Sequence, residues 1–335
     1  MNENRLFSIP YNGIDPNEYL NSIEPYKKNI ENIYFGAAYL IDNFHSVRNA
    51  RKLIGVNLDE KFINDYEENT HRFLLESKNK YKRIVVFNSS YYGLSLEELH
   101  KLLSTIILPY IEITGIDGCI CTDFNMARII HETFPKLEMH TSCNCFQWNI
   151  RQMEIWQKEC GISVFNPPRE ILRSPYKLKE MKEAGFKLKC IVNEACLYGC
   201  PQTIEHCMSF STNSEFTAYK TCNRGDIANI FRTNWVLPRW LDKLDKYVDI
   251  YKISGRMDPI EKIINTLDAF INVKEVEDIT SIFGGCNISL ISNTNIKIPS
   301  YIIPDKLLTC ECKECNKSCF ICEDLIKLCE LKNKY

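Results

Sequence analysis

The sequence has few glycines and prolines, and it has no long apolar run. Gly and Pro each account for 13 of the 335 residues, while 45% of the residues are hydrophobic. This composition is typical of a globular protein with room for a large core. No stretch approaches the roughly 18 apolar residues of a membrane span, and residues 1–13 hold no apolar run of signal-peptide length. We therefore expect a cytoplasmic protein without a membrane span.

An excess of charge of one sign is also missing. The chain has 41 Lys and Arg residues against 43 Asp and Glu residues, for a net charge of −2. This balance excludes a global basic surface for nucleic acid or anionic membrane, although a local basic groove stays open. No P-loop and no G-x-S-x-G elbow is present, and no G-x-G-x-x-G follows a strand, which argues against a dinucleotide-binding fold.

Cysteine, in contrast, is abundant. The chain has 17 cysteines, an odd number, and disulfides are disfavoured in the reducing cytoplasm. Clustered cysteines therefore predict metal or redox chemistry. Three cysteines stand apart from the clusters: Cys119 and Cys121 lie in an apolar strand, and Cys160 lies at a helix end. We expect these three to be buried small hydrophobic residues.

Eight apolar segments recur along the chain, mostly with helical patterns between them. They are Leu6–Tyr11, Asn32–Ala37, Arg83–Asn88, Gly118–Asp123, Leu137–Ser142, Ile162–Pro167, Leu188–Asn193 and Asp249–Arg256. Their nearly continuous apolar character suits a sheet that is buried on both faces. The pattern predicts an α/β fold, a (β/α)8 barrel of the TIM type over residues 1–275. A cysteine-rich insert (194–248) follows the seventh strand, and a small cysteine-rich extension (276–335) follows the barrel.

The helical segments between the strands carry recognisable start signals. One helix begins near Pro16 with Asp15 as its cap, and another begins near Leu94 with Ser95 and Glu98 as a capping box. The other predicted helices are His45–Ile54, Glu60–Lys78, Phe124–Phe134, Gln147–Glu159, Ser174–Ala184 and Pro259–Asn272.

Polar residues gather where the predicted strands end, which is the face that carries the chemistry of such barrels. The candidates for substrate binding are Asn88, Asp123, Asn166, Arg169, Asn193 and Arg256. The two arginines suit a carboxylate or phosphate, which a guanidinium binds in bidentate fashion. His140 and Glu170 lie at the same face and are candidates for catalysis. For any single residue the alternative is a structural role, as a helix cap or as a partner of a neighbour.

The insert carries the first group of clustered cysteines. Cys196, Cys200, Cys207 and Cys222 supply the four thiolates that an iron–sulfur cluster needs. His206 is a further candidate, as a replacement ligand or as an acid or base. Zinc would accept the same residues, but the spacing lacks the paired C-x2-C knuckles of structural zinc sites. A site without metal is the third alternative.

The C-terminal extension carries the second group. Cys312, Cys315, Cys319 and Cys322 form a C-x2-C-x3-C-x2-C pattern, which is close to ferredoxin spacing. Two arrangements stay open: the extension holds its own 4Fe–4S cluster as an electron relay, or it folds over the barrel mouth and shares ligands with Cys196 and Cys200. An extension without metal is again the alternative.

Three segments together resemble a known family. NIYFGA, EMHTSCNCFQWN with GISVFNPPREI, and CNRGD with YVDIYKISGRMDP follow in order between Ile33 and Asn272. They resemble the strands and turns of the collagenase-like peptidase family, peptidase family U32. The resemblance implies a barrel and, in the redox members of the family, a cysteine-held iron–sulfur cluster near its mouth. Those members hydroxylate quinone precursors or RNA bases without oxygen.

The leading hypothesis is an iron–sulfur redox enzyme that hydroxylates or similarly modifies a biosynthetic intermediate, a peptide or RNA. His140 or His206 would transfer protons, and an electron donor or partner protein would supply electrons. The second hypothesis is a peptidase with Glu170 or Glu194 as its base. No zinc-protease helix motif and no Ser/His/Asp constellation supports it. The third is a non-catalytic iron–sulfur subunit of a heteromeric enzyme.

Overall fold

Eight parallel strands form the centre of the protein. A computed structural model describes residues 4–37, 60–90, 92–212, 227–284, 296–310 and 318–332. The strands are β1 (Phe7–Pro10), β2 (Ile30–Gly36), β3 (Arg83–Phe87), β4 (Gly118–Cys121), β5 (Glu138–Thr141), β6 (Ile162–Val164), β7 (Lys189–Ile191) and β8 (Ile250–Lys252). They form one sheet in the order β6-β5-β4-β3-β2-β1-β8-β7. Each strand falls within or beside a segment that the sequence predicts, so all eight predicted strands are confirmed.

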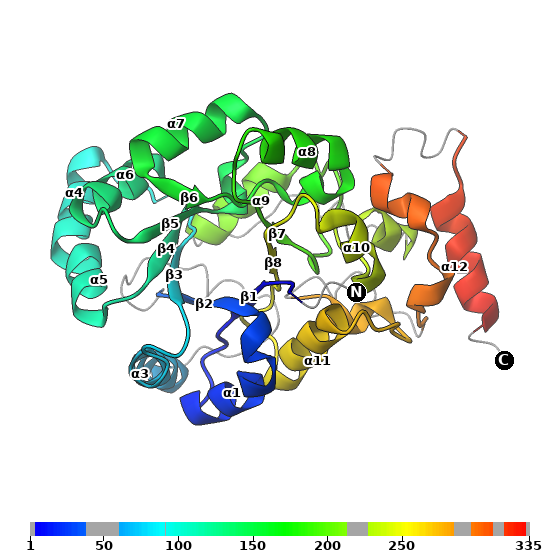
Figure 1. Cartoon of the computed structure of the whole chain (residues 1–335), viewed down its shortest axis with the longest axis horizontal. Coiled ribbons are helices and arrows are strands. Elements are labelled where there is room, and N and C mark those ends of the chain that lie inside the picture. Colours follow the sequence, from blue (N-terminus) through cyan, green and yellow to red (C-terminus); the bar gives the residue numbers. More distant parts are fainter. Residues whose placement is uncertain are drawn as a thin grey trace.

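The two outer strands of this sheet, β6 and β7, meet just beyond β6. Phe165 and Leu188 form a parallel bridge there. The Phe165 N–H donates to the Lys187 carbonyl at 2.8 Å, and the Lys189 N–H donates to the Phe165 carbonyl at 2.7 Å. These bonds bring the open edges together, and the predicted (β/α)8 barrel is confirmed (Figure 1).

Helices surround the barrel (Figure 1). They are α1 (Pro16–Ile23), α3 (Glu60–Glu76), α4 (Leu96–Leu102), α5 (Leu108–Thr114), α6 (Phe124–Thr133), α7 (Ile150–Cys160), α8 (Pro175–Glu183), α9 (Thr203–Thr212), α10 (Leu241–Leu244), α11 (Ile260–Ile271) and α12 (Ile321–Lys332). None of these described helices has the length and apolar character needed to cross a membrane.

The predicted helix starts hold in most places. The Asp15 carboxylate accepts from two backbone N–H groups of α1, and Ser95 with Glu98 forms the predicted capping box of α4. Helix α7 begins later than predicted, because the Asn149 side chain accepts from the Gln152 N–H and caps the helix there. The predicted helix at 45–54 lies outside the described residues.

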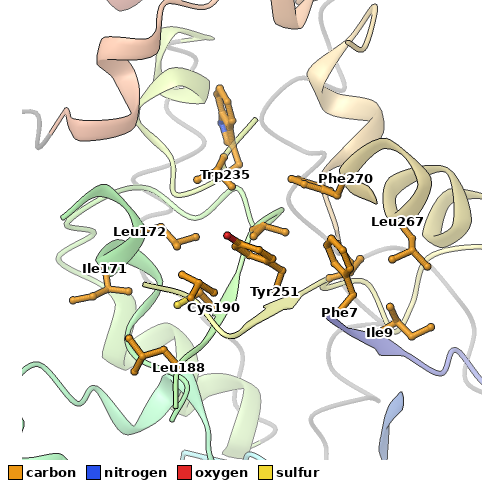
Figure 2. Close-up of a cluster of buried hydrophobic side chains, with 14 of the residues drawn as sticks. Phe7, Ile9, Ile171, Leu172, Leu188, Cys190, Trp235, Tyr251, Leu267 and Phe270 are labelled. Carbon is orange, nitrogen blue, oxygen red and sulfur yellow. The ribbon is translucent and has the colours of Figure 1, made fainter. Parts of the chain in front are cut away.

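The strands bury both faces, and the two faces differ. Tyr34, Ile84, Val86 and Ile120 form a small apolar cluster inside the barrel. The other face packs against the helices and forms the main core, which Figure 2 shows around Phe7, Cys190, Trp235 and Tyr251. Cys119, Cys121 and Cys160 are fully buried in this main core, as predicted. Cys190 also points to the helices, away from the barrel interior.

The C-terminal extension packs against the insert that follows β7. Helix α12 lies on the 3-10 helix Ile227–Arg232, and the extension lies across the molecule from α4 and α5 (Figure 1). Leu307, Leu308, Leu325 and Ile326 belong to the same core as the barrel. The buried Arg173 side chain donates to the Phe231 carbonyl at 2.7 Å and to the Cys310 carbonyl at 3.3 Å, so it joins the barrel, the insert and the extension.

Candidate active site at the barrel mouth

An ion pair marks the C-terminal face of the barrel. Arg169 follows β6 and Glu194 follows β7, and the Arg169 Nε donates to the Glu194 Oε2 at 2.6 Å. A second guanidinium nitrogen of Arg169 donates to the Asn144 Oδ1 at 3.0 Å. Burial alone would lower the pKa of Arg169. The nearby Cys143 and Glu194 have the opposite effect, and the net pKa lies well above its ordinary value. Arg169 is therefore a permanent cation in the mouth.

Three thiols surround this ion pair. The Cys143 and Cys207 sulfurs lie 3.6 Å and 3.7 Å from the Asn144 Oδ1, and the Cys196 sulfur lies 3.7 Å from the Glu194 Oε1. The three come from separate places: the segment after β5, the helix α9 and the segment after β7. Burial raises the pKa of Cys207 to about 11 and the pKa of Cys196 well above its usual range. Both thiols are therefore protonated unless a cation binds them.

The predicted cluster ligands are only partly brought together. Cys196 and Cys207 lie beside Arg169, whereas Cys200 lies in a partly exposed turn where its carbonyl accepts from the Thr203 hydroxyl at 2.9 Å. Cys222 lies outside the described residues. Among the residues that the structure describes, no group of three or more His, Cys, Asp or Glu could hold a metal ion. The described residues therefore bring two of the four predicted insert ligands, Cys196 and Cys207, to the same ion pair, and they do not complete a metal site.

The second predicted cluster is described in part. Cys312 and Cys315 lie outside the described residues. Cys319 is partly exposed, and Cys322 is buried at the start of α12. His206 is partly exposed on α9, and its backbone N–H donates to the Gln202 carbonyl.

Inside the barrel, below the mouth, polar side chains form a chain. The His140 Nε2 lies 2.6 Å from the Glu138 Oε1, and the His140 Nδ1 lies 2.6 Å from the Lys189 Nζ. Burial, with Lys189 as the next cause, lowers the pKa of His140 to about 3, so the imidazole is neutral. Glu138 is a carboxylate, because its hydrogen bond to His140 lowers its pKa to about 2. The neutral ring thus donates to Glu138 and accepts from Lys189. His140 has no exposed surface and is held on both nitrogens.

Glu170 lies next to Arg169 in the 3-10 helix Arg169–Arg173. Its side chain is nearly buried, and burial raises the pKa of its carboxyl above the ordinary value. A carboxyl of this kind exchanges protons closer to neutral pH than an exposed one does. A raised pKa is one property that the predicted acid or base requires.

Three of the predicted binding residues make local structural bonds. Asp123 caps α6 by accepting from the Met126 N–H at 2.8 Å. The Asn166 side chain donates to the Thr141 carbonyl, and its Oδ1 is buried without a partner among the described residues. The Asn193 Oδ1 accepts from the N–H and the hydroxyl of Ser254, at 2.7 Å and 3.1 Å. Asn88 is partly exposed just after β3.

Arg256, another predicted binding residue, follows β8. It is partly exposed, and it lies near enough to Tyr34 and Lys252 to lower the pKa of both groups by its charge. It makes no hydrogen bond or ion pair to another described residue. Arg169 and Arg256 are thus the two predicted binding residues whose charged groups lie at the mouth.

The sequence predictions omitted two interior lysines, Lys189 in β7 and Lys252 in β8. Burial lowers the pKa of Lys252 to about 8 and the pKa of Lys189 well below its ordinary value. A signal was available, since both interrupt apolar strands, LKCIV and IYKIS, and they occupy neighbouring strands. A charged residue inside a strand that is otherwise buried on both faces is unusual and points to the barrel interior.

Comparisons with known proteins agree with this architecture. A sequence profile of peptidase family U32 matches residues 26–247. An uncharacterized protease of Methanocaldococcus jannaschii is 25% identical over 302 residues, which cover 85% of this chain and 87% of the relative. The solved structure of the U32 peptidase Mk0906 superposes with a TM-score of 0.51 at 10% identity, over 74% of this chain and 92% of that one. The chain belongs to peptidase family U32.

Proposed function

We propose that the protein is a redox enzyme whose active site is the barrel mouth and whose insert cysteines hold an iron–sulfur cluster. The observation that carries this proposal is the convergence of the Cys196 and Cys207 thiols on the Arg169–Glu194 ion pair. Reduced thiols grouped at the functional end of a barrel suit soft metal ligation. The reaction would be an oxygen-independent hydroxylation or a related modification of a biosynthetic intermediate, a peptide or RNA.

The residues of the mouth have separate roles in this proposal. Arg169 and Arg256 bind the anionic part of the substrate. Glu170, with its raised pKa, and His206 on α9 are the candidates for moving a proton. His140 is sealed in the barrel interior and holds Lys189 and Glu138 in place. A bound cluster would supply one-electron transfer, and an electron donor or partner protein would be required.

Purification without oxygen tests the cluster. The protein should be brown and should contain iron and acid-labile sulfide, and Cys196→Ser and Cys207→Ser should each lose most of both. Cys190→Ser is the matched control, because its thiol is buried among apolar side chains of the main core. Colourless wild-type protein that is active without iron would overturn the proposal.

A truncation before Cys310 tests the role of the extension. If the extension holds its own cluster, half of the iron should be lost, whereas loss of all the iron would mean shared ligands. Because α12 packs on the insert at Ile227–Arg232, circular dichroism of the truncated protein must show that the barrel is still folded. Replacing Cys312 and Cys315 with Ser in the full chain gives the same comparison without removing α12.

A peptidase is the second candidate, and two observations favour it. The relative from Methanocaldococcus jannaschii carries the name of a protease, and burial raises the pKa of Glu170 toward that of a general base. Cleavage of gelatin or a peptide library would show this activity. Cleavage that is lost in Glu170→Gln and kept after iron removal would identify a peptidase; the absence of cleavage would leave the redox proposal in place.

A further inference from the structure

The amine of Lys252 lies inside the barrel, at the end of β8. Neighbouring residues of a strand point to opposite faces. Tyr251 lies in the main core beside Phe7 and Cys190 (Figure 2), so Lys252 points inward. Its Nζ lies 4.3 Å from the centre of the Tyr34 ring, which belongs to the cluster inside the barrel.

No acidic side chain among the described residues is paired with this amine. Within the described ranges, Lys252 forms no ion pair and no side-chain hydrogen bond. Burial has the largest effect on the pKa of Lys252 and lowers it. Among the neighbouring groups, Cys143 and Glu194 raise this pKa, whereas Arg256 and Arg169 lower it. An unpaired amine inside a barrel loses its proton far more readily than a surface lysine does. The free amine is a nucleophile toward carbonyl groups.

The second interior lysine, Lys189, differs from Lys252 in its hydrogen bonding and in its exposure. Its Nζ is 2.6 Å from the His140 Nδ1, and the residue has no exposed surface. Lys252, in contrast, is partly exposed, and it is the last residue of β8, at the C-terminal end of the strand. Of the two lysines inside the described barrel, Lys252 is the one that a ligand can contact.

The segment after Lys252 is built to present Arg256. Asn193 fixes Ser254 through the N–H, hydroxyl and carbonyl of that residue. Gly255 follows with a φ of +125°, and a Cβ there would lie 2.3 Å from an Asp258 oxygen, so the turn requires glycine. The guanidinium of Arg256 is thereby held near Lys252, with no hydrogen bond or ion pair to another described residue.

We propose that Lys252 forms an imine with a carbonyl compound whose anionic group is bound by Arg256. The proposal adds a substrate class to the proposed active site and rests on that site for its location. The lone pair of the amine forms a bond to the carbonyl carbon, and the carbonyl oxygen takes up a proton. The nitrogen then loses a proton, and the hydroxyl leaves as water after a second protonation. The products are a protonated imine and water, and no oxidant or reductant is needed.

The ligand is an aldehyde or ketone that carries a carboxylate or a phosphate, since a guanidinium binds either group in bidentate fashion. Reductive trapping tests the proposal in the full chain. The protein is incubated with sodium cyanoborohydride and either pyruvate, for a carboxylate, or dihydroxyacetone phosphate, for a phosphate. We expect a single adduct by intact mass spectrometry, located on Lys252 by peptide mapping, with one of the two probes favoured.

Two variants and a control make the test specific. Lys252→Arg keeps the positive charge but cannot form an imine, and it should abolish the adduct. Arg256→Gln should raise the half-saturating probe concentration by about tenfold or more, since a charged hydrogen-bonded contact is lost. Lys179→Met removes a lysine on the exposed surface of α8 and should change nothing.

Labelling spread over exposed lysines, or equal labelling of wild type and Lys252→Arg, would overturn the proposal. Circular dichroism shows whether each variant is folded, and Lys252→Met provides a second variant that cannot form an imine. Trapping does not depend on iron, so the same samples, analysed for iron and sulfide, separate a failure of this proposal from a failure of the proposed redox function.

Discussion

The barrel interior has two levels, and they differ in whether their charged side chains have hydrogen-bond partners. At the lower level Glu138, His140 and Lys189 form a continuous hydrogen-bonded chain in which each side chain has a partner. At the upper level Lys252 and Arg256 lie close together without an acidic partner among the described residues. The two lysines come from neighbouring strands of one sheet, β7 and β8, so the difference between the levels lies in pairing and not in the fold.

The comparison separates a structural role from a ligand-binding role. A buried polar chain with all its hydrogen bonds made stabilises one arrangement of a core. Two cations held together near the mouth are unfavourable until an anion joins them. The lower level therefore stabilises the barrel, whereas in our proposal an anionic ligand joins the two cations of the upper level.

Breaking the lower level should have the largest effect. His140→Leu leaves the Lys189 amine without its acceptor in a place with no exposed surface. We expect the free energy of unfolding to fall by about 3 kcal/mol, because both Lys189 and Glu138 lose a hydrogen-bond partner. Urea denaturation followed by circular dichroism measures it. His100→Leu, on the exposed surface of α4, is the control; an equal loss in both variants would contradict a special role for the chain.

Acid should weaken the lower level without any mutation. The pKa of His140 falls from 6.5 to about 3 on folding, and the pKa of Glu138 falls from 4.5 to about 2. Below the ordinary pKa of histidine the unfolded chain therefore binds protons that the folded chain does not. The free energy of unfolding should drop by on the order of 2 kcal/mol between pH 7 and pH 4.5. Denaturation at several pH values measures it, and His140→Gln should reduce the slope.

Loosening the support of the upper level should have a smaller effect on stability. Asn193→Ala removes the side chain that fixes Ser254, and we expect a loss of roughly 1–3 kcal/mol, the cost of leaving buried polar groups unpaired. Imine trapping at Lys252 should fall as well. Asn272→Ala removes an exposed amide that bonds to Asp268 and should change neither property. Trapping at the wild-type rate in Asn193→Ala would separate the turn from the function of Lys252.

Removing the unpaired amine itself should cost least. Lys252→Met keeps the approximate volume of the side chain and removes a charge that has no acidic partner among the described residues, so the free energy of unfolding should stay within about 1 kcal/mol of wild type or rise. The difference between variant and wild type should shrink above about pH 8, because the native amine then becomes neutral. A large loss of stability, measured by thermal unfolding, would mean that Lys252 has a structural partner.

The fold was predictable because its signals are local. Each strand is an apolar run, and the capping groups of α1 and α4 lie within a few residues of the helix start. Helix α12 was not predicted. Its apolar side chains are buried by packing against the distant segment Ile227–Arg232 and the rest of the core. Such long-range packing cannot be derived from the sequence of either segment alone.

The site was predictable in part. Arg169 and Arg256 follow β6 and β8, and a position just after a barrel strand is sufficient to place them at the mouth. The same rule also selected Asn193, whose side chain bonds to the neighbouring turn at Ser254 instead. The position of a residue just after a strand does not distinguish a ligand-binding role from a structural role in the neighbouring turn. Lys252 was missed because it lies within its strand.

The packing of α12 on the insert has a consequence for synthesis. The 3-10 helix Ile227–Arg232 and its partner α12, joined by the Arg232–Glu323 ion pair, are far apart in the chain. All eight barrel strands leave the ribosome before α12 is made. During that interval the surface of the insert that α12 covers is open to water, so a nascent chain with a complete sheet still presents an unfinished face to chaperones and proteases.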